Sequence, residues 1–95
     1  MDIEARQLPM AGLPLNFSVD GGLGVCNIKV FVDSKLVHQH DCDDPPCHEM
    51  VMIPPGTRGA TLRIIATDSV GNKEEFISQV GDTGSGASGM IKMEG

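Results

Sequence analysis

Residues 59–80 read GATLRIIATDSVGNKEEFISQV, and this stretch predicts how the rest of the chain is organised. In residues 60–67 apolar and polar side chains alternate, which is the pattern of a strand with one buried face. Residues 68–72 combine a capping aspartate with a Gly-Asn pair that tolerates positive φ, so the chain can reverse there. Residues 73–80 then return as a second strand. Because an isolated hairpin is only marginally stable in water, other strands have to cover its apolar face.

Length and charge limit the classes of function. The 95 residues, of which 40% are apolar, suffice for one small domain with one core. A formal net charge of −6 disfavours nucleic acid and anionic membrane surfaces, since either would be approached against electrostatic repulsion. The longest apolar runs are only a few residues, so we expect no membrane insertion, and the N-terminus lacks the pattern of a signal peptide.

Alternating patterns predict further strands around residues 13–20, 25–33, 35–40 and 49–53, separated by glycine- and proline-rich turns. Residues 1–12 are expected to form an N-terminal edge segment, residues 13–80 the folded domain, and residues 81–95 a Gly/Ser-rich tail or linker. A two-residue turn at residues 33–34 would place Val32 opposite Lys35 and Cys26 opposite Asp41. In that register His38, His40 and Cys42 lie on the face opposite to Cys26, whereas Val37 and Gln39 share the Cys26 face.

Six to seven short strands without helical periodicity predict an all-β fold, a sandwich of antiparallel strands. The run IKVFVDSKLV, a later Pro-Gly turn and the run TLRIIATDSVGN resemble the bacterial immunoglobulin-like (Ig-like) domains repeated in secreted and cell-surface proteins. The resemblance covers residues 13–80 and implies an Ig-like β-sandwich in an extracellular, cell-surface or periplasmic setting. It further implies a non-catalytic spacer or an adhesion and protein-interaction module, whose partners are other proteins or neighbouring domains. We expect a monomer.

The three histidines and two of the three cysteines fall within residues 38–48. A disulfide between Cys42 and Cys47 is the first interpretation, because the intervening Asp-Asp-Pro-Pro segment can bring the two Cα atoms within bonding range. The Ig-like domains that the chain resembles often carry a cysteine-bracketed, proline-rich loop at this place. Free thiols or another pairing are the alternatives. Cys26 is then expected to be an unpaired core residue.

The same cluster offers a second function, a small metal-binding or redox domain. Its imidazoles and thiolates are ligands of Zn²⁺ and copper, with His38, His40 and His48 as the candidate metal ligands. The segment from Cys42 to His48 also resembles a lengthened attachment motif for c-type haem. Haem would take its second axial ligand from His38, His40, Met50 or Met52.

Acidic residues form the last candidate site. If the strands run as a meander, the loops at residues 20–24, 41–48 and 68–72 emerge at one end of the sandwich. That end would carry a rim for Ca²⁺ or for a protein partner, made of Asp20, Asp41, Asp43, Asp44, Asp68 and Asn72. The alternative is structural: aspartates at strand ends cap turn amides, and the others keep the loop solvated. The sequence contains no nucleophile elbow and no phosphate loop, so we predict no catalytic residues.

The Gly/Ser-rich tail generates a first prediction. Its small polar residues bury too little surface to offset the entropy lost on ordering. Truncation after Asp82 should therefore leave the thermal unfolding midpoint unchanged within error. A loss of several degrees would mean that residues 90–93 dock as a strand.

Overall fold

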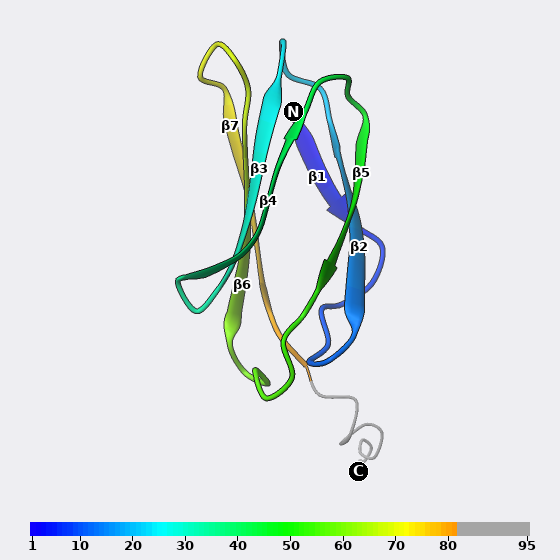
Figure 1. Cartoon of the computed structure of the whole chain (residues 1–95), viewed down its shortest axis with the longest axis vertical. Helices are drawn as coiled ribbons and strands as arrows, with labels where there is room; N and C mark the ends of the chain where they lie inside the picture. The colour runs from blue at the N-terminus through cyan, green and yellow to red at the C-terminus, as the bar shows by residue number, and fades with distance from the viewer. Residues whose placement is uncertain (82–95) are drawn as a thin grey trace.

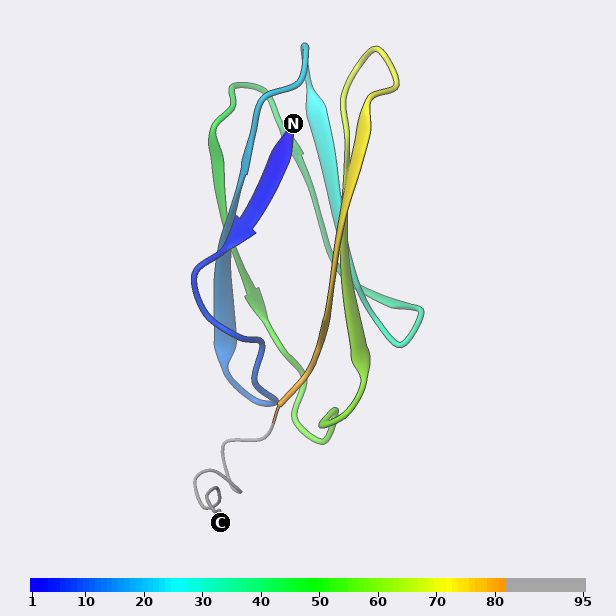
Figure 2. The ribbon, with the colours of Figure 1, turned by 180° about the vertical axis from the view of Figure 1, so that it is seen from behind.

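The computed structural model describes residues 1–81, which form two antiparallel β-sheets packed face to face, with no helix among them (Figures 1 and 2). The three-stranded sheet has the order β1-β2-β5, with β1 at Asp2–Ala5, β2 at Pro14–Asp20 and β5 at Cys47–Met52. The four-stranded sheet has the order β4-β3-β6-β7, with β4 at Lys35–Cys42, β3 at Cys26–Val32, β6 at Thr61–Thr67 and β7 at Lys73–Gln79. The prediction of an all-β sandwich of six to seven antiparallel strands is confirmed, and the number is seven.

The core lies between the sheets and follows from the alternation of side chains along each strand. In β3 every second residue is buried, beginning with the first, and in β6 every second residue is buried, beginning with the second. Burying a Val, Leu or Ile side chain fully stabilises the fold by roughly 1.5–3 kcal/mol, which makes these alternating positions the main stabilising contribution. The innermost apolar side chains are Leu15, Val19, Ile28, Val30, Ile53, Leu62 and Ile64.

Both ends of the domain are tied into the sandwich. The edge strand β1 pairs with β2, with Ile3 opposite Val19. At the other end of the molecule the backbone of Gly81 donates a hydrogen bond to Pro9 and accepts one from Ala11. Gly81, the first residue of the predicted tail, is therefore bonded to the fold, and residues 82–95 of that tail lie outside the described residues.

The hairpin between β3 and β4 corrects the predicted register. Asp33 and Ser34 both have positive φ and form the predicted two-residue turn, with Val32 opposite Lys35. Beyond the turn, however, Phe31 pairs with Leu36 and Val30 pairs with His38, so Val37 is an extra, bulged residue.

One extra residue exchanges the two faces of the strand beyond it. Consequently Cys42, and not Asp41, is the residue that lies opposite Cys26, and His40 lies opposite the buried Ile28. The predicted placement of His38, His40 and Cys42 on the face opposite to Cys26 is therefore wrong, because all three side chains lie on the inner face.

Three loops gather at one end of the sandwich, as predicted. The connections β2–β3, β4–β5 and β6–β7 lie together at the top of Figure 1, and the opposite end carries β1–β2 and β5–β6. The described residues contain no helix that is long and apolar enough to cross a membrane.

The bulge makes a test by deletion possible. Removal of Val37 converts the hairpin into a regular ladder in which the remaining pairs and faces are retained. We expect the variant to keep the Cys42–Cys47 disulfide and to lose only about 1 kcal/mol, because a half-buried Val side chain is removed. Urea unfolding and non-reducing peptide mapping measure both quantities.

Insertion of one alanine between Gln39 and His40 is the matched control. It turns Cys42 to the outer face while the bulge remains, so oxidation to the disulfide should fall sharply. Equal behaviour of the deletion and the insertion would contradict the observed register.

Candidate functional site

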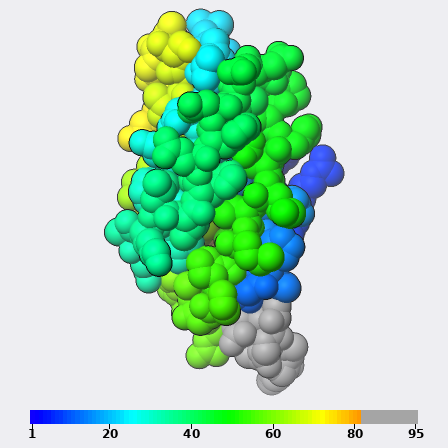
Figure 3. All heavy atoms as spheres, viewed as in Figure 1, coloured from blue at the N-terminus to red at the C-terminus, as the bar shows by residue number. Residues whose placement is uncertain are grey.

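Two features set the loop end of the molecule apart, and the first is a covalent link between the sheets. Cys42 at the end of β4 and Cys47 at the start of β5 form a disulfide with a Cα–Cα distance of 6.3 Å. The pairing predicted from the sequence is confirmed, and it joins the four-stranded sheet to the three-stranded one. Because the closed loop is short, chain entropy accounts for only about 2 kcal/mol of stabilisation. Its geometric effect is to hold the edge strands β4 and β5 together, and Figure 3 shows the surfaces of these two strands side by side.

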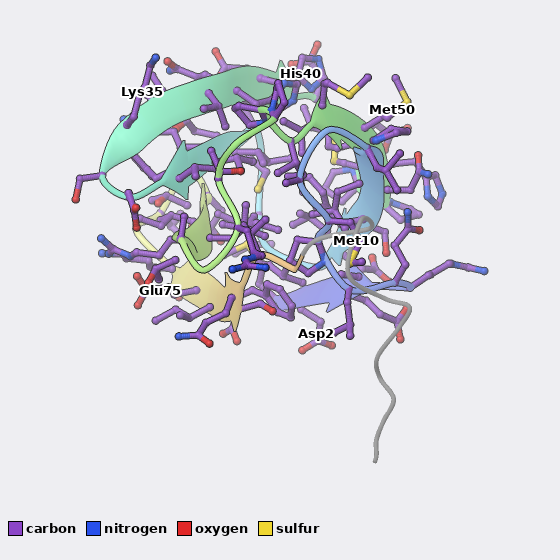
Figure 4. The ribbon with its side chains drawn as sticks, turned by 90° about the horizontal axis from the view of Figure 1, so that it is seen from below. Asp2, Met10, Lys35, His40, Met50 and Glu75 are labelled. Atoms are coloured by element: carbon purple, nitrogen blue, oxygen red, sulfur yellow. A yellow bond between two sulfur atoms is a disulfide. The ribbon has the colours of Figure 1, made fainter. Side chains whose placement is uncertain are left out.

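Below the disulfide, a buried carboxylate joins the same two strands. Glu49 Oε1 lies 3.0 Å from His38 Nε2, and Glu49 Oε2 lies 2.9 Å from His40 Nδ1. The Glu49 side chain is only 7% exposed, since Cys47, Glu49 and Val51 all point inward from β5. Each imidazole donates one N–H to the carboxylate, so neither buried oxygen lacks a hydrogen bond. Figure 4 shows His40 at the edge where β4 approaches β5.

We call this group the seam: the Cys42–Cys47 disulfide together with His38, His40 and Glu49. Sequence reasoning missed Glu49, although its position carried a signal. Cys47, Glu49 and Val51 occupy alternating positions on one face of β5, and the outer two of these residues are buried. A charged residue at such an inward position needs a partner, and the bulge in β4 supplies two imidazoles.

The predicted metal ligands are not brought together as a group. His38 and His40 face inward to Glu49, whereas His48 is exposed on the outer face of β5, opposite Ser18 of β2. Within residues 1–81 no group of three or more His, Cys, Asp or Glu side chains is arranged to hold a metal ion. The haem motif has its two sulfurs joined in the disulfide, so they cannot also form thioether bonds, and Met50 and Met52 are exposed.

The second feature is the acidic rim. Asp20, Asp41, Asp43 and Asp44 are exposed at the loop end, as expected for a rim. Asp20 accepts a hydrogen bond from the Gly21 N–H at 2.8 Å, and Asp41 accepts one from the Asn27 side chain at 2.6 Å. The Asp20 contact matches the turn-capping alternative, whereas the Asp41 contact joins cross-strand partners of β3 and β4. Both carboxylates remain at the surface.

Asp68 and Asn72 differ from the rest of the predicted rim because they tie loops together. The Asp68 carboxylate is buried and accepts hydrogen bonds from the N–H groups of Leu23, Val70 and Asn72 and from the Asn72 side chain, at 2.8–3.1 Å. Burial raises the pKa of Asp68, but these hydrogen bonds, led by the Asn72 side chain, outweigh it and hold the pKa below its usual value. Asp68 therefore fixes the β6–β7 loop to the β2–β3 loop and is not free to bind a ligand.

A polar hollow of about 510 Å³ lies on the outer face of the three-stranded sheet. The residues lining it are Asp2, Ile3, Glu4, Arg6, Ser18, Asp20, Pro46 and His48. Sequence reasoning missed it because β1 was not assigned a register. Once β1 pairs with β2 and β2 with β5, Glu4, Ser18 and His48 form one row across the sheet.

Cys26 is unpaired and fully buried, as predicted. Burial and the nearby Asp68 charge raise the pKa of its thiol, which disfavours the nucleophilic thiolate. Its sulfur contacts the Met1 sulfur at 3.8 Å.

No protein-family model, curated protein or solved structure matches this chain.

The seam generates a prediction for Glu49. Glu49→Ala removes the acceptor for both imidazoles, and we expect a loss of about 1 kcal/mol, mostly from His38, because His40 is 53% exposed and water can replace its partner. Glu49→Gln retains one acceptor and should lose less. Urea midpoints at constant pH measure both changes.

Gln39→Ala is the matched control, since Gln39 is exposed on β4 between the two histidines. It should leave the midpoint unchanged. Equal stability of wild type and Glu49→Ala would show that the carboxylate does not hold the two strands together.

The hydrogen bonds of Asp68 lead to a prediction about stability at acidic pH. The folded-state pKa of Asp68 is lowered, so its contribution to stability is complete above the unfolded pKa of about 4 and is lost as pH falls through the lowered value. Asp68→Asn should be less stable than wild type at neutral pH, and the difference should shrink below about pH 4. Denaturant midpoints measured between neutral and acidic pH test this, and a constant difference would refute it.

Proposed function

We propose that the chain is a non-catalytic, Ig-like module of a larger secreted or cell-surface protein. The order of its strands supports this proposal. The chain crosses between the sheets after β2, after β4 and after β5, which gives sheets β1-β2-β5 and β4-β3-β6-β7. Antiparallel sandwiches with such crossings, and with loops gathered at both ends, are the architecture of Ig-like modules. The resemblance of residues 28–37 and 61–72 to bacterial Ig-like domains agrees with this.

The setting that suits the molecule is an oxidising one, outside the cell or in the periplasm. The Cys42–Cys47 disulfide joins the two sheets, so its reduction would loosen the seam. Disulfides of this structural kind persist where thiols are not kept reduced.

The acidic loop end carries the proposal of an interaction function. Asp43 and Asp44 are exposed there on the β4–β5 loop, which the disulfide closes, and Asp20 and Asp41 are exposed near the ends of β2 and β4. The Asp68 hydrogen bonds hold the neighbouring β2–β3 loop. A surface that is already rigid loses little entropy on binding, and its charge favours a basic partner. The module therefore binds a basic surface on another protein or a neighbouring domain, and without such a partner it acts as a spacer.

Binding to a basic peptide tests the interaction. A ¹⁵N-labelled chain titrated with a short poly-lysine peptide at moderate salt should show amide shifts confined to the three loops at the acidic end. The double variant Asp43→Asn/Asp44→Asn should weaken binding several-fold. Shifts spread evenly over the surface, or none, would remove the interaction function and leave the spacer.

Asp33→Asn is the control for the single variant Asp43→Asn, because it changes the net charge equally and its side chain is exposed in the β3–β4 turn, outside the acidic end. It should leave binding unchanged if the rim, rather than total charge, attracts the peptide. A parallel titration with Ca²⁺ tests the alternative ligand. Saturable amide shifts at the rim would show that the rim is a calcium site.

A further inference from the structure

The buried thiol of Cys26 lies across the hairpin from one sulfur of the disulfide. Cys26 and Cys42 are direct cross-strand partners, so their side chains point to the same inner face of the sheet. Residues opposite each other in an antiparallel pair have Cα atoms roughly 4.5–5.5 Å apart, and disulfides span roughly 4.4–6.8 Å. A bond between Cys26 and Cys42 therefore requires no change of register.

We propose that Cys26 is an alternative disulfide partner of Cys42, so that the loop end of the module can hold either of two bridges. One bridge, Cys42–Cys47, links the two sheets, and the other, Cys26–Cys42, links β3 to β4 within one sheet. The proposal goes beyond the interaction function, because it concerns how firmly the acidic loop is attached.

The exchange is balanced without an external oxidant. Cys26 loses its proton, and its sulfur attacks the Cys42 sulfur. The Cys26–Cys42 bond forms as the Cys42–Cys47 bond breaks, and Cys47 leaves as a thiolate that takes up a proton. The number of disulfides stays at one, so there is no net oxidation or reduction.

Several features keep the exchange slow while the sandwich is closed. Cys26 has no exposed surface, and the Met1 side chain contacts its sulfur. Its raised pKa keeps it in the thiol form, which attacks poorly. Opening of the loop end, or alkaline pH, removes these obstacles.

The consequence is a change in the seam. After exchange, no disulfide links β5 to β4, and the exposed loop containing Asp43 and Asp44 has a disulfide at only one of its two ends. The free thiol moves from Cys26 on β3 to Cys47, whose side chain points inward from the edge strand β5.

Two single variants test the pairing. Cys47→Ser, incubated with oxidised glutathione under native conditions, should form an intramolecular Cys26–Cys42 bond and lose two hydrogens, leaving no thiol to alkylate. Cys42→Ser carries Cys26 and Cys47, which are not cross-strand partners, and should form no intramolecular bond under the same conditions. Two alkylatable thiols or two glutathione adducts on Cys47→Ser, or equal bond formation in both variants, would overturn the proposal.

The wild-type chain provides a measurement that does not depend on how the variants fold. The oxidised protein is held at mildly alkaline pH, with and without denaturant, quenched with acid, and digested with trypsin and an aspartate-directed protease. Cleavage before Asp43 separates Cys42 from Cys47, so each bridge gives its own fragments. Without denaturant the new bridge should be Cys26–Cys42 alone, whereas denaturant should also give Cys26–Cys47. The proposal would be contradicted if a Cys26–Cys47 bridge formed without denaturant. It would also be contradicted if no new bridge formed without denaturant while the denatured chain did exchange its disulfide.

Discussion

A single extra residue in β4 determines how the open edge of this sandwich is closed. The bulge at Val37 turns the following residues by one position, so that Cys42 and the two histidines face inward. Without the bulge, Gln39 and Asp41 would point into the core and the sulfur of Cys42 would point into solvent. The register of β4 on β3 therefore sets both the disulfide and the contacts of Glu49.

The seam fastens two edge strands that share no ladder of hydrogen bonds. Strands β4 and β5 belong to different sheets, and edges of this kind are prone to pairing with other chains unless they are covered or charged. Here the bulge, the histidine–glutamate contacts and the disulfide occupy that edge. The individual contributions are modest, about 2 kcal/mol for the disulfide and about 1 kcal/mol for the contacts with Glu49, yet they act at one place. The same fastening presents the acidic loop as a rigid surface.

Much of the fold could be predicted because alternation along the chain is a local signal. Residues 60–67 show it in the sequence, and the side chains of Leu62, Ile64 and Ala66 are buried as it requires. The turn at Asp33–Ser34 followed from a short-range pattern as well. The grouping of three loops at one end was predicted from an assumed meander, which the strand orders β1-β2-β5 and β4-β3-β6-β7 do not follow, although the three loops do lie at one end. The disulfide was predicted correctly, although the predicted face of Cys42 was wrong.

The bulge could not be predicted, because Val37 and His38 are both acceptable at the inner position and no glycine marks the irregularity. Contacts with residues far away in the sequence decide where the bulge lies. Cys47 and Glu49 on β5 bond to Cys42, His38 and His40 only when these three side chains point inward. The register of β3 and β4 can be measured by nuclear Overhauser contacts between backbone protons across the hairpin. Contacts pairing Cys26 with Cys42 and Ile28 with His40 are expected, whereas contacts pairing Cys26 with Asp41 would contradict the inward placement on which the seam depends.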